Sequence, residues 1–174
     1  MTENTQTLRR WLPLGAVVAL LALWFAPDSS GEMPLEQAIK TVRGDGSRVL
    51  LTFEDPNCGY CKRLHRDLQR IDNVTVYTFL VPILGKDSER KARNIWCARD
   101  REAAWREWML DARVPAEASC EADAIARNLR LARQWDVRGV PALFLANGKR
   151  FRGYIPANRL EAELAAAANE GAGK

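Results

Sequence analysis

The sequence predicts an α/β fold preceded by one hydrophobic helix near the N-terminus. Segments of strand length alternate with segments of helical spacing, and a Cys-x-x-Cys pair, Cys58 and Cys61, stands where a strand passes into a helix. An uncharged stretch at residues 11–26 precedes all of these segments. The 174 residues are 47% hydrophobic and 28% charged, which excludes a low-complexity or wholly disordered chain. The net charge of +4, from 26 basic and 22 acidic residues, gives no reason to expect nucleic acid as a partner.

The uncharged stretch, WLPLGAVVALLALWFA, follows Arg9 and Arg10 and precedes Asp28. As a helix it would span about 24 Å, slightly short of the roughly 30 Å hydrocarbon core of a membrane. It is therefore either a retained signal anchor or the apolar part of a signal peptide cleaved after Gly31. The arginines favour a cytoplasmic N-terminal end. The rest of the chain is then expected in the periplasm, tethered to the inner membrane by residues 11–26 or soluble after cleavage.

The chain is expected to divide into the stub and apolar segment at 1–31, a linker at 32–47 and a folded domain at 48–174. The linker should contain a short helix at 34–42, because Pro34 suits a first helical position. In the domain, β-branched and aromatic runs predict strands, and apolar residues every three or four positions predict helices. The expected elements are a strand at 48–54, a helix at 58–71, a strand at 74–80, helices at 86–111 and 116–134, a hairpin with arms at 142–145 and 150–154, and a helix at 158–168.

This order describes a parallel β-α-β unit, a helical insertion at about 86–134, an antiparallel hairpin and a final helix. Asn147-Gly148 between the last two strands is a typical hairpin turn. In the thioredoxin fold a Cys-x-x-Cys pair opens the helix of such a β-α-β unit. The sequence therefore predicts a thioredoxin fold with a helical insertion.

The position of the Cys-x-x-Cys pair predicts its chemistry. Unpaired N–H groups and the helix dipole favour a thiolate at Cys58, and a thiolate is the species that attacks a disulfide. Cys61 lies one turn further along the same helix face, so it should resolve the resulting mixed disulfide. Gly59 and Tyr60, between the cysteines, are expected to tune the redox potential. Cys58 and Cys61 are thus the predicted catalytic residues of a thiol:disulfide oxidoreductase.

Four cysteines allow three pairings, and the simplest joins Cys58 to Cys61 and Cys97 to Cys120. A periplasmic location would let such disulfides persist. The alternative for Cys58 and Cys61 is a purely structural disulfide or half of a zinc site. No second pair with zinc-ligand spacing occurs, so neither a metal nor another cofactor is expected. For Cys97 and Cys120, the alternative to a structural bridge is a redox relay.

Three titratable residues near the cysteine pair are candidates for a role in its chemistry. Glu54 and Asp55 could accept the proton of Cys61, although thioredoxins and oxidases carry their buried acid at the position of Thr52. His65 follows Cys61 by one turn of the same helix. It could tune a thiolate, but we expect a surface or partly packed side chain.

The segment Cys58-Gly59-Tyr60-Cys61-Lys62 resembles the active site of the DsbC/DsbG family of periplasmic disulfide isomerases. The likeness extends from about residue 48 to about residue 165. Ile95-Trp96-Cys97-Ala98 and Ala118-Ser119-Cys120 resemble the segments of the family's second disulfide. The resemblance implies a nucleophilic Cys58, a resolving Cys61 and a structural bridge on the helical insertion.

A second matching segment is Arg138-Gly139-Val140-Pro141-Ala142, which is similar to the family's cis-proline loop. The resemblance implies that Pro141 is a cis-proline facing the cysteine pair, with backbone groups left free for an extended substrate chain. The family's isomerases usually carry threonine before this proline, whereas here Val140 presents no hydroxyl to the sulfurs. Valine at that position is also found in the oxidase DsbA.

The resemblance implies a disulfide isomerase or reductase that acts on exported proteins and is kept reduced by a membrane electron donor of the DsbD type. An oxidase or a dedicated tethered thioredoxin-like reductase is the alternative enzyme. A membrane-tethered chaperone or assembly factor with structural cysteines is the non-enzymatic alternative. The family's isomerases dimerise through a separate N-terminal domain, and the short stretch before the first predicted strand leaves no room for one. We therefore expect the catalytic domain without that dimerisation domain.

Overall fold

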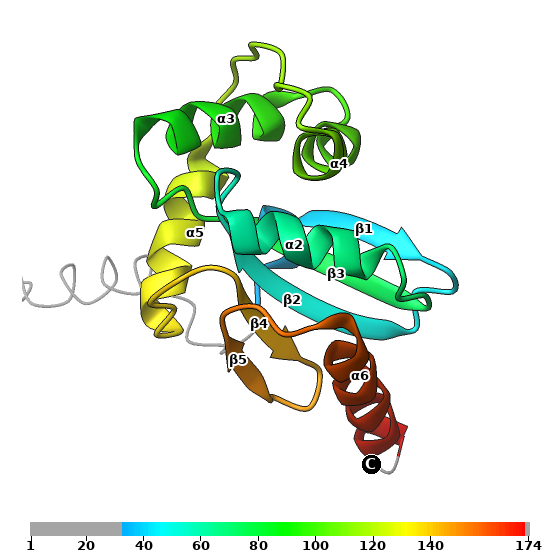
Figure 1. The fold of residues 1–174 in the computed structure, drawn as a ribbon. Helices are drawn as coiled ribbons and strands as arrows, with labels where there is room; N and C mark the ends of the chain where they lie inside the picture. The colour runs from blue at the N-terminus through cyan, green and yellow to red at the C-terminus, as the bar shows by residue number, and fades with distance from the viewer. Residues whose placement is uncertain (1–32, 173–174) are drawn as a thin grey trace, which may run out of the picture. The chain divides into compact units, whose positions relative to one another are not determined.

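A mixed five-stranded sheet forms the centre of the structure (Figure 1). The structure is a computed structural model that describes residues 33–172, so the hydrophobic helix predicted at 11–26 lies outside the described residues. The strand order is β1-β3-β2-β4-β5, and only β2 and β3 are parallel neighbours. The strands are β1 (Ile39–Arg43), β2 (Arg48–Glu54), β3 (Val74–Leu80), β4 (Ala142–Leu145) and β5 (Arg150–Arg152).

Helices cover both faces of this sheet (Figure 1). They are the 3₁₀ turn η2 (Leu35–Gln37) and the α-helices α2 (Gly59–Leu68), α3 (Lys86–Cys97), α4 (Arg101–Asp111), α5 (Asp123–Gln134) and α6 (Ala157–Ala172). Helices α2 and α6 pack on one face, and α5 lies against the other. Within residues 33–172 no helix combines the length and the apolar character that a membrane crossing needs.

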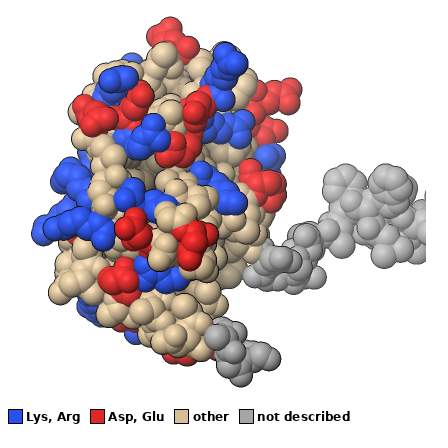
Figure 2. Space-filling view, turned by 90° about the vertical axis from the view of Figure 1, so that its right-hand side faces the viewer, with Lys and Arg blue, Asp and Glu red and all other residues tan. Residues whose placement is uncertain are grey.

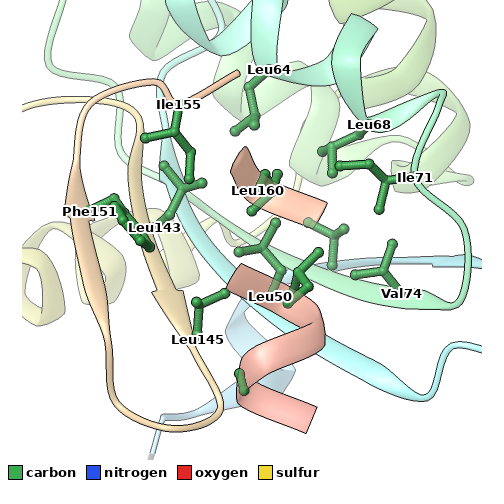
Figure 3. Packing of buried hydrophobic residues seen from close by; sticks show 13 residues of the cluster. Leu50, Leu64, Leu68, Ile71, Val74, Leu143, Leu145, Phe151, Ile155 and Leu160 are labelled. Carbon is green, nitrogen blue, oxygen red and sulfur yellow. The ribbon is translucent and has the colours of Figure 1, made fainter. Parts of the chain in front are cut away.

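The face beneath α2 and α6 holds the larger hydrophobic core (Figure 3). Side chains alternate across a strand, so Leu50 and Leu143 point into this core while Phe53 and Phe144 meet edge to face on the opposite side. The buried members are Leu50, Leu64, Leu68, Ile71, Val74, Val76, Leu143, Leu145, Phe151, Ile155, Leu160, Leu164 and Ala167. This packing holds α2, which begins directly after Cys58, against the end of β2.

The prediction of a short helix at 34–42 is wrong. The structure has the short turn η2 followed by β1, which pairs antiparallel with β3 from Ile39 opposite Thr78 to Arg43 opposite Val74. Burial alternates along β1, with Ile39 inside and Lys40 exposed, as expected of an edge strand. The pairing supplies backbone hydrogen bonds that outweigh a weak local helix preference. The sheet therefore begins before residue 48, where we expected the domain to start.

The helical insertion consists of α3, α4 and α5, but two of its expected boundaries are wrong. The helix expected at 86–111 is broken before Asp100, whose side chain accepts the N–H of Ala103 at 2.9 Å and caps α4. The helix expected from residue 116 begins only at Asp123. The preceding segment is instead held beside α3 by the Cys97–Cys120 disulfide.

Basic and acidic side chains are interspersed on the face shown in Figure 2. In the described part of the chain, charged side chains also pair within one helix, such as Lys91 with Asp87 and Arg106 with Glu102, each four residues apart. On this face the charges form a mixed solvated surface without an extended patch of one sign.

Candidate active site

The first cysteine of the pair occupies the N-cap position of α2. Cys58 has extended backbone angles, and its Sγ accepts the N–H of Cys61 at 3.2 Å. The hydrogen bond from the Cys61 side chain contributes most to lowering the pKa of Cys58, which falls from 9.0 to about 7. The backbone N–H groups of Cys61 and Tyr60 act in the same direction, against burial and the charge of Glu54. The helix start thus stabilises a thiolate at Cys58 near neutral pH.

The second cysteine has the opposite environment. Cys61 is fully buried among apolar side chains that include Leu80, Ile95 and Trp105. Burial raises the pKa of the Cys61 thiol far above its ordinary value, and the hydrogen bond with Cys58 and the charge of Glu54 add to that rise. Near neutral pH the structure therefore pairs a thiolate at Cys58 with a thiol at Cys61.

The loop expected to carry a cis-proline lies against this pair. The Val140–Pro141 peptide bond is cis, and the carbonyl oxygen of Val140 lies 3.5 Å from Cys58 Sγ. The sheet brings these segments together, because Phe53 at the end of β2 is paired with Ala142 at the start of β4. The loop is also fixed by the N–H of Gly153, which donates to the carbonyl oxygen of Pro141 at 2.8 Å.

The two residues between the cysteines are Gly59 and Tyr60, and Cys58 itself is buried, with only 6% of its surface exposed. Apart from its chain neighbours and the backbone of its own helix, a Cβ atom at Gly59 would meet no atom within 4 Å. Tyr60 is 63% exposed, and its ring stacks on that of Tyr154 with centroids 6.3 Å apart. Gly59 and Tyr60 are thus exposed at the surface next to the buried Cys58.

Asp55 is a structural residue in this site. Its carboxylate is fully buried and accepts four hydrogen bonds, from the N–H groups of Asn57, Ile83 and Leu84 and from the Ser88 hydroxyl. These bonds, of 2.7 to 2.9 Å, join the turn before α2 to the loop after β3. A carboxylate occupied in this way positions the loops around Cys58, which is a different role from the proton acceptor considered from the sequence.

Glu54 instead forms a buried polar cluster beneath α2. Its carboxylate accepts the Thr52 hydroxyl at 2.8 Å, and its two oxygens lie 3.2 and 3.0 Å from His65 Nε2. The indole N–H of Trp105 donates to the same His65 nitrogen at 3.1 Å. In a neutral imidazole ring, Nε2 can either accept the N–H of Trp105 or carry a proton and donate it to Glu54. The tautomer of His65 therefore decides which of these two hydrogen bonds forms.

His65 differs from our expectation of a surface or partly packed residue. It is 8% exposed, because α4 of the insertion places Trp105 edge-on against its ring, with centroids 5.2 Å apart. Nothing local in the sequence marks this burial, since Trp105 lies far along the chain. The spacing of one helical turn between Cys61 and His65 was the only available signal.

Removing the charge of Glu54 is expected to lower the pKa of Cys58 below about 7, since that charge raises it. Glu54→Gln keeps the size of the side chain and an oxygen that can accept the Thr52 hydroxyl. The rate of Cys58 alkylation, followed from pH 4 to 9, measures the change. Glu161→Gln, at an exposed partner of Arg48, is the matched control and should leave the midpoint in place. An unchanged midpoint in Glu54→Gln would show that Glu54 carries no charge that reaches Cys58.

Among residues 33–172, no group of three or more His, Cys, Asp or Glu side chains is arranged to hold a metal ion.

The architecture and the position of the cysteine pair define a class of protein. Residues 35–168 match the family of thioredoxin-like domains, and the chain belongs to this family. The predicted thioredoxin fold with a helical insertion is therefore confirmed.

Within this class, several similar proteins are named as disulfide interchange proteins, which confirms the resemblance to DsbC. The chain is 53% identical over 133 residues to the probable thiol:disulfide interchange protein DsbC of Bordetella parapertussis, over 76% of this chain and 47% of that protein. It is 37% identical over 117 residues to DsbC of Escherichia coli K12, over 65% of this chain and 49% of that protein. The chain thus spans about half the length of these curated relatives. A crystal structure of a disulfide interchange protein from Neisseria gonorrhoeae matches with a TM-score of 0.74 and 38% identity, over 78% of this chain and 99% of that one.

Proposed function

We propose that this chain is a periplasm-facing thiol:disulfide oxidoreductase that isomerises or reduces disulfides in exported proteins. The observation that carries the proposal is the contrast between the two cysteines of the Cys-Gly-Tyr-Cys segment. Cys58 has a pKa of about 7 beside the cis-proline loop, whereas burial raises the pKa of Cys61. The relatives named as thiol:disulfide interchange proteins support the same reaction class.

The reaction begins when the Cys58 thiolate attacks one sulfur of a substrate disulfide. That S–S bond breaks, a mixed disulfide forms, and the second substrate sulfur leaves as a thiolate. In isomerisation this thiolate attacks another disulfide of the substrate, and a substrate thiolate finally displaces Cys58. The protein neither gains nor loses electrons in that sequence.

In reduction the mixed disulfide is resolved by the second cysteine. Cys61 loses its proton and attacks Cys58 Sγ, which forms the Cys58–Cys61 disulfide and releases the substrate thiolate. Two electrons pass from the protein thiols to the substrate, so a dithiol donor must reduce the protein again. We propose a membrane donor of the DsbD type for this step.

The buried position of Cys61 favours isomerisation over rapid reduction. Its raised pKa makes the attacking thiolate rare near neutral pH, so resolution is slow. A slow second step prolongs the mixed disulfide and gives the substrate time to rearrange. Oxidation is the second candidate, because the residue before the cis-proline is Val140 and valine at this position is also found in the oxidase DsbA.

The periplasmic location and the tether are part of the same proposal. The uncharged stretch at residues 11–26, preceded by Arg9 and Arg10, would cross or approach the inner membrane with the catalytic domain outside the cytoplasm. Retention of this stretch would tether the domain near a membrane donor, and cleavage would release it.

A Cys61→Ser variant of the full chain tests the proposed chemistry. Without the resolving thiol, mixed disulfides through Cys58 should accumulate with substrates in the periplasm and with the electron donor. They are separated on non-reducing gels and identified by mass spectrometry. The Cys58→Ser/Cys61→Ser double variant is the control and should trap nothing. If Cys61→Ser also traps nothing, the proposed attack by Cys58 is wrong.

A further inference from the structure

A groove of about 340 Å³ lies on the face of the sheet opposite α2, beside the cis-proline loop. Its apolar lining comes from Trp135 just after α5, Phe144 of β4 and Val140 of the loop. The rings of Trp135 and Phe144 meet edge to face, with centroids 5.6 Å apart. Trp135 and Val140 are only partly buried, so this surface is accessible to an apolar side chain from another molecule.

Three arginines surround this apolar surface. Asp136 forms ion pairs with Arg138 at 2.7 Å and with Arg152 at 3.0 Å. The Arg150 guanidinium lies over the Trp135 ring, 5.0 Å from its centroid. In the part of the chain that the structure describes, no carboxylate lies within 4.0 Å of Arg150. The groove thus has three guanidinium groups for one carboxylate, and Arg150 is available to an incoming anion.

One loop residue, Val140, links the groove to the surroundings of Cys58. Val140 lines the groove, and its carbonyl oxygen is 3.5 Å from Cys58 Sγ. An extended polypeptide advances about 3.3 Å per residue. A substrate whose cysteine is bonded to Cys58 would therefore place the adjoining residues of its chain at the groove.

We propose that this groove binds the substrate segment next to the reacting disulfide and selects an extended segment that carries an aromatic and an acidic side chain. The aromatic side chain would pack on Trp135 and Phe144, and the carboxylate would pair with Arg150. A planar guanidinium binds a carboxylate through two parallel hydrogen bonds, which gives direction as well as charge. This inference rests on the proposed function, since it assumes that Cys58 reacts with disulfides of polypeptides.

The test compares two peptides, each with one cysteine in a mixed disulfide with a small chromophoric thiol. One peptide carries Phe and Asp beside the cysteine, and the other carries Phe and Lys. The wild-type full chain should react with the Asp peptide about tenfold faster, which corresponds to about 1.4 kcal/mol. Arg150→Gln should bring the ratio of the two rate constants close to one, and Arg150→Glu should invert it. Both rate constants of a ratio are measured on the same protein sample, so a partial loss of folded protein lowers both equally and leaves the ratio unchanged.

Arg93→Glu is the matched control, because it makes the same charge change at an exposed site on α3. It should preserve the wild-type ratio. Equal rates for both peptides with the wild-type chain would overturn the groove proposal, as would a ratio that Arg150→Glu leaves unchanged. Equal rates would also be the result if another part of this chain or a second copy filled the groove. If the wild-type chain reacted with neither peptide nor with the neutral disulfide of 2-mercaptoethanol, the proposed function itself would fail.

Discussion

Cys58→Ser is expected to reduce disulfide exchange by at least about three orders of magnitude, in line with losses seen when an enzyme loses its nucleophile. A serine hydroxyl does not ionise near neutral pH, whereas the Cys61 side chain and the backbone N–H groups at the helix start lower the pKa of Cys58 to about 7. Turnover of a scrambled disulfide substrate measures the loss. Activity that survived the change would favour the non-enzymatic reading, in which the cysteines are structural.

The pH dependence of Cys58 follows from the same contacts. Because its pKa is lowered from 9.0 to about 7, the thiolate predominates above about pH 7 and is lost as the pH falls through that value. Alkylation of the reduced protein should therefore accelerate with a midpoint near pH 7. The stability that the thiolate adds to the reduced fold should grow as pH rises from about 7 to 9, since the unfolded chain binds more protons there. Cys61 should stay unmodified throughout this range, because burial raises its pKa.

Cys58→Ala, which fills less space and carries no hydroxyl, is a suitable companion to Cys58→Ser. Both variants should lose activity to the same extent if thiolate chemistry is responsible. Both should keep the midpoint of urea unfolding close to that of the wild type, measured below pH 7 where the thiol is protonated. A variant that unfolded would be recognised by this measurement and would not be counted as a catalytic loss.

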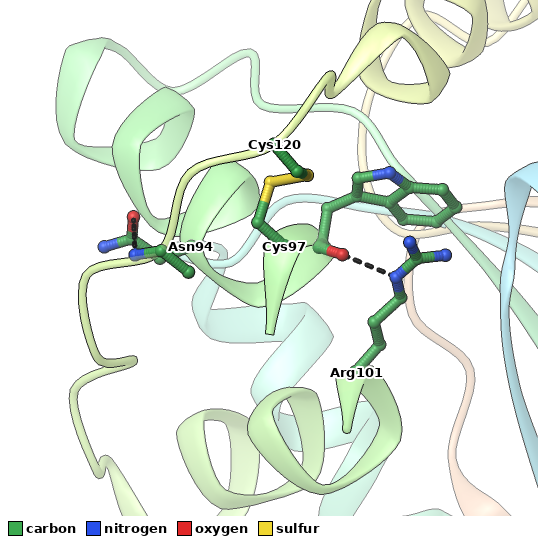
Figure 4. Close-up of a disulfide and its surroundings, with 6 residues drawn as sticks. Asn94, Cys97, Arg101 and Cys120 are labelled. Carbon is green, nitrogen blue, oxygen red and sulfur yellow. Dashed lines mark hydrogen bonds between the residues drawn. A yellow bond between two sulfur atoms is a disulfide. The ribbon is translucent and has the colours of Figure 1, made fainter. Parts of the chain in front are cut away.

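The double variant Cys97→Ser/Cys120→Ser is expected to lose about 3 kcal/mol of folding free energy, the value for closing a loop of this length. The disulfide joins Cys97, the last residue of α3, to the segment between α4 and α5, 23 positions further along the chain (Figure 4). Without it, the extended segment retains few ties to α3, one of which is a hydrogen bond from the Ala118 N–H to the Asn94 side chain at 3.4 Å. For a domain with a total stability of about 5–15 kcal/mol, this is a large fraction.

A measurement of activity distinguishes a structural role of Cys97 and Cys120 from a role as a redox relay. A structural bridge predicts that the double variant, kept at a temperature where it is folded, exchanges disulfides at nearly the wild-type rate. A redox relay predicts loss of activity even in the folded variant. Urea unfolding gives the free energy, and turnover of the same samples gives the rate. Wild-type stability in the double variant would contradict the structural role.

The β-α-β unit and its cysteine pair could be predicted because the signals are local. Residues 48–54 and 74–80 are short apolar runs of strand length, and both strands were found with the expected bounds. A helix then has to connect them, and its first turn has to carry Cys58 and Cys61. The linker strand was missed because an edge strand has one exposed face, so Ile39 and Val42 also fit a helical pattern.

The sequence by itself determined the fold class, the position of Cys58 at a helix start and the elements that surround it, since periodicity and turn residues act over a few neighbours. Only the tertiary structure decided what each buried face contacts. It placed Glu54 in contact with His65, beside Trp105, and it gave the Asp55 carboxylate its hydrogen bonds from loop N–H groups and the Ser88 hydroxyl. It also formed the arginine-lined groove from the end of α5 and strand β5. Periodicity reports that a side chain is buried, but the partner it meets depends on segments far along the chain.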